Sequence, residues 1–247
     1  MAKKTLLQIT QSVLSSMNSD SVNSISDLDE SYQVAEKAQE VYEDLMELED
    51  WEHLRTMTQL DSLSDSSKPN YLKIPEGVSE IKTIRYDIRS ELTDAVKYTE
   101  ITQLYPDDFL AKVLSRNSND DNTLSITDPS GVPLLIKDNK APQYWTTFDG
   151  EYIVFDSYDS DIDTTLQQSK NLTQCVKEVS FSLTDSFIPD MPSKMFPAYI
   201  QEVTRVCSLY FREQPSQNDE RRAFRSLANM KNKASKTLNK RHKYGRS

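Results

Sequence analysis

The feature that most restricts the fold of this chain is a change in apolar spacing, which is helical near both ends and strand-like between them. Residues 5–17, 28–52 and 192–211 each carry an apolar stripe at spacings of three and four. The three stripes comprise Leu6, Ile9, Val13 and Met17; Leu28, Val34, Ala38, Val41, Leu45 and Leu48; and Met195, Tyr199, Val203, Val206 and Tyr210. Each stripe must be covered, so we expect helices from the two chain ends to pack together.

The limits of these helices are predicted from capping residues. Asp27 with Glu30 forms a capping box for the second helix. Pro192 is well placed at the start of the third helix. A last helix is expected to begin at Asn218 or Asp219, with Phe224, Leu227 and Ala228 on its apolar edge.

The middle of the chain is punctuated by prolines and contains short runs rich in β-branched and aromatic residues. Six runs predict strands, at 71–77, 79–87, 122–128, 132–138, 143–149 and 151–158. Asp149-Gly150 predicts a two-residue type I′ hairpin between the last two runs. Residues 107–117 predict a short helix, and 165–184 a further strand pair that ends with VSFSLTD.

Together these patterns predict an α+β protein. A helical bundle is built from the N- and C-terminal helices, an antiparallel β-rich domain is inserted between them, and an extended basic tail follows. The predicted parts are residues 1–52 and 188–236 for the bundle, 53–187 for the insertion and 237–247 for the tail. No stretch approaches the roughly 20 apolar residues that a membrane span requires.

The residue types that carry out catalysis are sparse. The chain has four scattered glycines and two distant histidines, which make neither a phosphate loop nor a catalytic pattern. Cys175 and Cys207 lack metal-ligand spacing and are interpreted as buried or half-buried thiols. The acidic run from Asp156 to Asp163 resembles a calcium loop only in part and is interpreted as a solvated turn. We therefore expect no cofactor, no metal and no enzyme.

Charge is distributed unevenly along the chain. Residues 221–247 contain ten Lys or Arg and no acid, so the net charge of −10 leaves residues 1–220 at −20. Such a tail is typical of a disordered soluble end, of an arm that binds nucleic-acid phosphates, or of an arm that binds an acidic protein surface. A second charged feature is the row Glu36, Glu40, Glu43 and Glu47, either a solvated face or a docking surface for a basic partner.

Four segments, in this order, resemble the head-to-tail adaptors of short-tailed bacteriophages, also called connector proteins or tail tubular protein A. They are TLLQITQSVLSSMNSDSVNSISDLDESYQVAEKAQEVYEDLMELEDWEHL, SKPNYLKIPEGVSEIKTIRYD, QYWTTFDGEYIVFDSYDSDIDTTLQ and FIPDMPSKMFPAYIQEVTRVCSLYF. The first resembles the family's two opening helices, the second its Leu/Ile-Pro strand, the third its aromatic hairpin and the fourth its closing Pro-Asp-x-Pro helix.

The resemblance implies a virion protein of the head–tail junction, assembled in the host cytoplasm and without catalytic activity or cofactor. Twelve copies would form a ring beneath the portal protein, with packaged DNA passing through the channel. The β part would face outward, toward a tail nozzle or tail tubular protein and tail fibers. The glutamate row would face the channel.

The C-terminal segment would then be a clamp on the portal or on a neighbouring copy. Its residues are Arg221, Arg222, Phe224, Arg225, Leu227, Lys231, Lys233, Lys236, Lys240, Arg241, Lys243, Tyr244 and Arg246. Two alternatives from other classes remain open. One is a nucleic-acid-binding protein that uses this arm, and the other is a small cytoplasmic enzyme.

Overall fold

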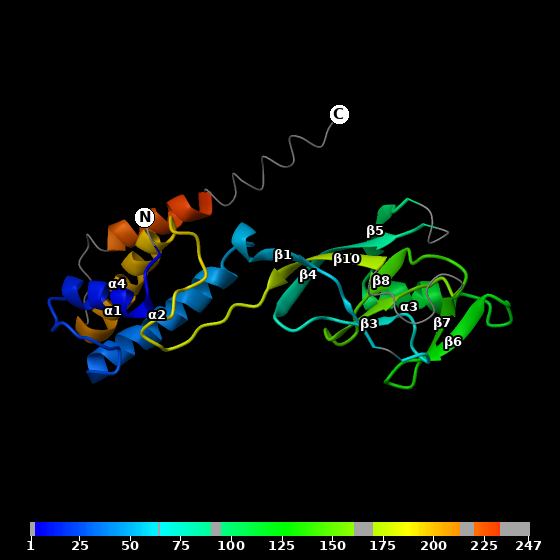
Figure 1. Cartoon of the computed structure of the whole chain (residues 1–247), viewed down its shortest axis with the longest axis horizontal. Coiled ribbons are helices and arrows are strands. Elements are labelled where there is room, and N and C mark those ends of the chain that lie inside the picture. Colours follow the sequence, from blue (N-terminus) through cyan, green and yellow to red (C-terminus); the bar gives the residue numbers. More distant parts are fainter. Residues whose placement is uncertain (1–2, 64, 90–94, 161–169, 213–219, 233–247) are drawn as a thin grey trace, which may run out of the picture. The chain divides into compact units, whose positions relative to one another are not determined.

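The computed structural model describes residues 3–63, 65–89, 95–160, 170–212 and 220–232 (Figure 1). The chain forms two units. The helical unit comprises Met1–Leu54 and Val179–Ser247, and the β unit comprises Arg55–Glu178. The predicted α+β class is confirmed, with helices from the C-terminal part packed on those from the N-terminal part.

Three helices make the body of the helical unit: α1 (Leu6–Ser16), α2 (Asp29–Glu47) and α4 (Phe196–Arg212). Each contacts the other two (Figure 1). Most of the predicted stripe residues are buried, although Leu28, Leu48 and Tyr210 at the helix ends are exposed. The helical spacing therefore identifies the core of this unit. No helix in the described part of the chain is long and apolar enough to cross a membrane.

Helix α2 is shorter than predicted, ending at Glu47 instead of near residue 52. The chain folds back so that the Trp51 indole Nε1–H donates to the carbonyl of Leu45 at 2.7 Å. This bond satisfies one of the carbonyls that a helix end leaves without a partner, and it buries the ring.

The predicted capping box of α2 is wrong. The Asp27 carboxylate accepts N–H groups of Asn23 and Ser24 in the preceding turn, and the N–H of Leu28 donates to the hydroxyl of Ser31. A capping box that we did not predict lies at α1, where Thr5 and Gln8 bond reciprocally.

The VSFSLTD segment, residues 179–185, is not a strand but part of the helical unit. The ring of Phe181 lies 5.4 Å from that of Tyr42 and 4.5 Å from that of Phe187. The N–H of Leu6 donates to the carbonyl of Phe187 at 2.7 Å. The alternating apolar residues of this segment therefore pack against helices and not within a sheet.

The β unit is built on an eight-stranded sheet in the order β1-β10-β4-β5-β8-β9-β3-β2. Its strands are β1 (Arg55–Thr58), β2 (Asp61–Ser62), β3 (Tyr71–Lys73), β4 (Val78–Asp87), β5 (Tyr98–Gln103), β8 (Tyr144–Thr146), β9 (Tyr152–Phe155) and β10 (Asn171–Lys177). Helix α3 (Pro106–Leu114) and a separate hairpin of β6 (Thr123–Thr127) and β7 (Pro133–Lys137) lie between β5 and β8 in the chain. All six predicted strands are present, and α3 ends three residues earlier than predicted.

The prediction of a purely antiparallel insertion is wrong at one pair, because β5 and β8 are parallel. Parallel neighbours need a long crossover connection, and α3 with the β6–β7 hairpin supplies it. The sheet is therefore mixed, and it forms a half barrel.

Strands β3 and β9 contribute buried side chains to both faces of the sheet. One face carries a cluster that includes Leu72, Ile153 and Phe155, and the other a cluster that includes Tyr71 and Val154 with Phe109 of α3. Neighbouring residues thus enter different cores, as the two-residue period of a strand requires.

The predicted hairpin between β8 and β9 is present, but the turn type is wrong. Residues 147–151 separate the two strands. Gly150 has φ +79°, whereas Asp149 does not have the positive φ that a type I′ turn needs. Asp149 Oδ1 instead accepts the N–H groups of Glu151 (2.8 Å) and Tyr152 (3.0 Å), so its carboxylate closes a wider loop.

Candidate functional site

The structure describes six of the thirteen predicted clamp residues, all on a helix at 220–232. They are Arg221, Arg222, Phe224, Arg225, Leu227 and Lys231. The remaining clamp residues, Lys233, Lys236, Lys240, Arg241, Lys243, Tyr244 and Arg246, lie outside the described residues, as do the predicted caps Asn218 and Asp219.

The buried side of this helix differs from the predicted edge. Ala223 and Met230, two turns apart, are buried, and the Ser226 hydroxyl lies in hydrogen-bond contact with the Gln201 side chain of α4. Phe224, which was expected to be on the packed edge, is 76% exposed. The small Ala223 occupies the place expected for the ring, and Phe224 is left facing solvent.

The groove beside Phe224 is lined by three arginines, Arg205, Arg221 and Arg225, and by two carboxylates, Glu202 and Glu220. Arg221, Arg222 and Arg225 are exposed on the same helix. Arg205 of α4 lies in the same groove, but it is paired with Glu202 at 2.6 Å. The hydrogen bond to Glu202 raises the pKa of Arg205. The helix thus presents the Phe224 ring close to three exposed arginines of the same helix.

All four glutamates of the row are exposed along α2. Glu40 pairs with Lys37 at 2.8 Å, and Glu43 accepts a bond from Gln39. The hydrogen bond to Glu40 raises the pKa of Lys37. Part of the negative charge of the row is therefore balanced on the same helix.

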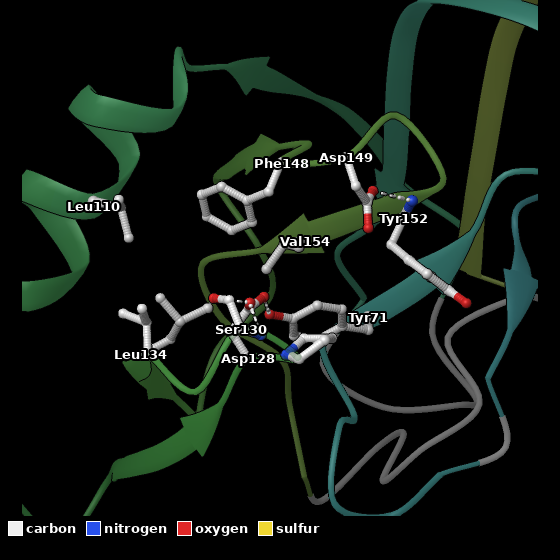
Figure 2. A pocket seen from close by; sticks show the side chains of 11 residues that line it. Tyr71, Leu110, Asp128, Ser130, Leu134, Phe148, Asp149, Tyr152 and Val154 are labelled. Atoms are coloured by element: carbon white, nitrogen blue, oxygen red, sulfur yellow. Dashed lines mark hydrogen bonds between the residues drawn. The ribbon is translucent and has the colours of Figure 1, made fainter.

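A pocket of about 310 Å³ lies in the β unit, where the sheet meets α3 and the β6–β7 hairpin (Figure 2). No sequence pattern predicted this pocket. Its lining residues are Tyr71, Leu110, Asp128, Pro129, Ser130, Val132, Leu134, Phe148, Asp149, Tyr152 and Val154. The lining is mainly apolar, which is typical of sites that take an apolar group from a ligand or partner.

One end of the pocket is polar, and its side chains form hydrogen bonds with one another. The Tyr71 hydroxyl donates to Asp128 Oδ2 at 2.5 Å, and Asp128 Oδ1 accepts the N–H and hydroxyl of Ser130 (Figure 2). Burial raises the pKa of Tyr71, and the bonded carboxylate raises it further. Burial opposes ionisation of Asp128, but bonds from Ser130 and Tyr71 hold its pKa below the ordinary value. The pocket therefore contains a neutral phenol beside a fixed negative charge.

The acidic run that was interpreted as a solvated turn begins with a buried ion pair. Asp156 is fully buried, and its Oδ2 lies 2.7 Å from Nη2 of Arg116. Its Oδ1 accepts the N–H groups of Gln143 and Tyr144, both at 2.9 Å. The interpretation is thus wrong for Asp156, while Asp161 and Asp163 lie outside the described residues. In the described ranges no three His, Cys, Asp or Glu side chains group as metal ligands.

Both cysteines are buried, as their sequence context predicts. Burial raises the pKa of Cys207 to about 12 and also raises that of Cys175. Because the thiolate is the reactive form, we expect neither thiol to react with a thiol reagent at pH 8 in the native protein. In denaturant both thiols should react, and the absorbance of the coloured thiol that an aromatic disulfide reagent releases measures the reaction. Rapid modification of one thiol in the native protein would contradict this burial.

No protein-family model matches this sequence, and no curated protein matches it significantly.

Proposed function

We propose that this chain is a head-to-tail adaptor of a short-tailed bacteriophage, a structural protein that joins the portal to the tail. Copies would form a ring around the DNA channel, and residues 221–247 would bind the portal or a neighbouring copy. The tail nozzle and fibers would attach on the far side of the ring.

The observation that carries the proposal is the last described helix. The two chain ends already bury their apolar stripes against each other, yet this helix leaves Phe224 exposed between Arg221, Arg222 and Arg225. Aromatic and arginine side chains are the residues that most often dominate protein–protein binding. The helix therefore offers a binding surface that the described part of its own unit does not cover. Four segments resemble the adaptor family in the same order, which favours the portal protein as the partner.

Charge supports a protein partner over DNA as the main one. Residues 1–220 carry a net charge of −20, which repels a polyanion from all but the C-terminal segment. A single arm that becomes ordered on binding holds weakly, because the ordering entropy opposes it. A ring of arms binds tightly through effective concentration once the first is bound. This favours assembly on the portal.

Co-sedimentation with purified portal rings from the same genome tests the proposal. We expect the full-length chain to pellet with the rings and a version ending at Glu220 to stay in the supernatant. Because truncation also uncovers the surface under Ala223 and Met230, a full-length variant with Arg221→Glu, Arg222→Glu and Arg225→Glu is the matched control. It should also stay in the supernatant.

Two outcomes count against the proposal. If neither form binds portal while the full-length chain retards DNA in a salt-dependent way, the segment is a nucleic-acid arm. Its log affinity would then fall by about 0.9 per neutralised phosphate for each log unit of salt. If the truncated form binds portal as well as the full-length form, the C-terminal segment is not the clamp.

A further inference from the structure

We infer that the pocket of the β unit receives Phe224 from a second copy of this chain. The inference rests on the proposed function in that an adaptor assembles from copies of itself, but the contact needs no portal. It links two features that the described residues leave without a partner. One is an exposed aromatic ring, and the other is an apolar pocket.

The pocket is large enough for the ring. An engineered apolar cavity of about 150 Å³ takes up benzene, and this pocket measures about 310 Å³. The side chains of Leu110, Leu134 and Val154 give it aliphatic walls, and the Phe148 ring lies across from Asp128 (Figure 2). A phenyl ring that enters can meet Phe148 in the tilted or edge-on geometry that aromatic pairs prefer.

The net charge of the side chains beside the ring is positive, although Glu202 and Glu220 lie there too, and that of the pocket lining is negative. Among the described residues that line the pocket there are two carboxylates, Asp128 and Asp149, and no Lys, Arg or His. The helix that carries Phe224 presents exposed arginines one residue after it and two and three residues before it. Complementary charge of this kind orients a contact and opposes wrong partners.

The pocket carboxylates are held in place before any partner arrives. Asp128 is bonded by Tyr71 and Ser130, and Asp149 by the N–H groups of Glu151 and Tyr152. Each carboxylate still has lone pairs to offer a guanidinium, since an ionised carboxylate accepts about four bonds. A preorganised acceptor loses less entropy on binding.

The contact joins the helical unit of one copy to the β unit of another, so successive copies can repeat it as a heterologous contact. A repeated heterologous contact closes into a ring or continues as a filament. A twofold dimer would instead contain two such contacts made reciprocally. When it repeats from copy to copy, the contact is of the type that a ring-forming protein requires.

A mixing experiment with two full-length variants tests the contact. Phe224→Ala removes the ring but keeps the pocket. Val132→Arg blocks the pocket, since Val132 lines it and is 41% exposed, but keeps the ring. Sedimentation velocity in the absence of portal measures association. We expect the wild type to self-associate and each variant alone to do so about tenfold more weakly or worse.

The decisive sample is the equimolar mixture of the two variants. It holds one intact ring and one intact pocket, so it should form a heterodimer that cannot extend further. Matched controls are Tyr32→Ala, which removes an aromatic ring 43% exposed on α2, and Val96→Arg, which adds a charge at a valine 56% exposed in the β unit. Both should associate as the wild type does.

A disulfide version detects a weaker contact. Phe224→Cys mixed with Val132→Cys should give a disulfide-linked dimer on a non-reducing gel that neither variant gives alone, and Phe224→Cys mixed with Val96→Cys should not. The native thiols are buried and do not compete. The inference is overturned if the mixture of Phe224→Ala and Val132→Arg stays monomeric and no selective disulfide forms. It is also overturned if the ring enters the pocket of its own chain, which would leave the wild type monomeric. If the wild type binds portal but its copies do not make this contact, this inference is overturned and the proposed function is not.

Discussion

Replacing Arg116 with methionine is expected to lower the free energy of unfolding of the β unit by about 3–5 kcal/mol. The guanidinium donates to the carbonyls of Leu135 (3.0 Å) and Asp156 (2.5 Å) and pairs with the Asp156 carboxylate at 2.7 Å. Methionine keeps the apolar stem but leaves the fully buried carboxylate without its cation. A buried charge that loses its counterion is among the most costly single changes in a protein.

Tryptophan fluorescence during denaturation in urea measures this effect. Trp145 is buried in the β unit and Trp51 in the helical unit, so a Trp51→Phe background reports the β unit alone. The control is Arg85→Met in β4, where the arginine is exposed; we expect a change within about 0.5 kcal/mol. Equal effects at Arg116 and Arg85 would show that the ion pair contributes nothing.

Elements with strong local patterns were predicted from the sequence, and those that depend on distant partners were not. The stripes of α1, α2 and α4 repeat over three or more turns, so burial on one face follows from spacing alone. Strand β5 was missed because Ile101 is its one buried side chain, which leaves no alternation to recognise. The parallel pairing of β5 and β8 depends on where α3 and the hairpin pack, and no local rule contains that information.

The candidate site shows the same limit. The Tyr71–Asp128 bond joins residues 57 positions apart, so neither residue type nor spacing predicts the pocket. The basic character of residues 221–232 follows directly from the sequence, but the exposure of Phe224 could not be predicted from it. A phenylalanine within an apolar edge is expected to be buried, and here the smaller Ala223 takes the buried position because the helix is rotated by about one residue.

Replacing Tyr199 with alanine is expected to destabilise the helical unit by about 3–5 kcal/mol, the cost of deleting a buried aromatic side chain. Tyr199 on α4 is fully buried, and its ring centroid lies 6.2 Å from that of Tyr42 on α2. Its hydroxyl donates to the carbonyl of Ala38 at 2.6 Å, across 161 positions of sequence. Fluorescence of Trp51 in a Trp145→Phe background measures the loss.

Two further variants separate packing from hydrogen bonding at this position. Tyr199→Phe keeps the ring and removes the hydroxyl, so it should cost only about 1 kcal/mol. Tyr32→Ala removes an exposed ring of α2 and should change stability by no more than about 0.5 kcal/mol. If Tyr199→Ala leaves the Trp51 transition unchanged, the two ends of the chain do not stabilise each other through this contact. If the transition shifts as expected, the helices before and after the β unit unfold as one body. The C-terminal helix then has a folded base from which Phe224 and its arginines can reach a partner.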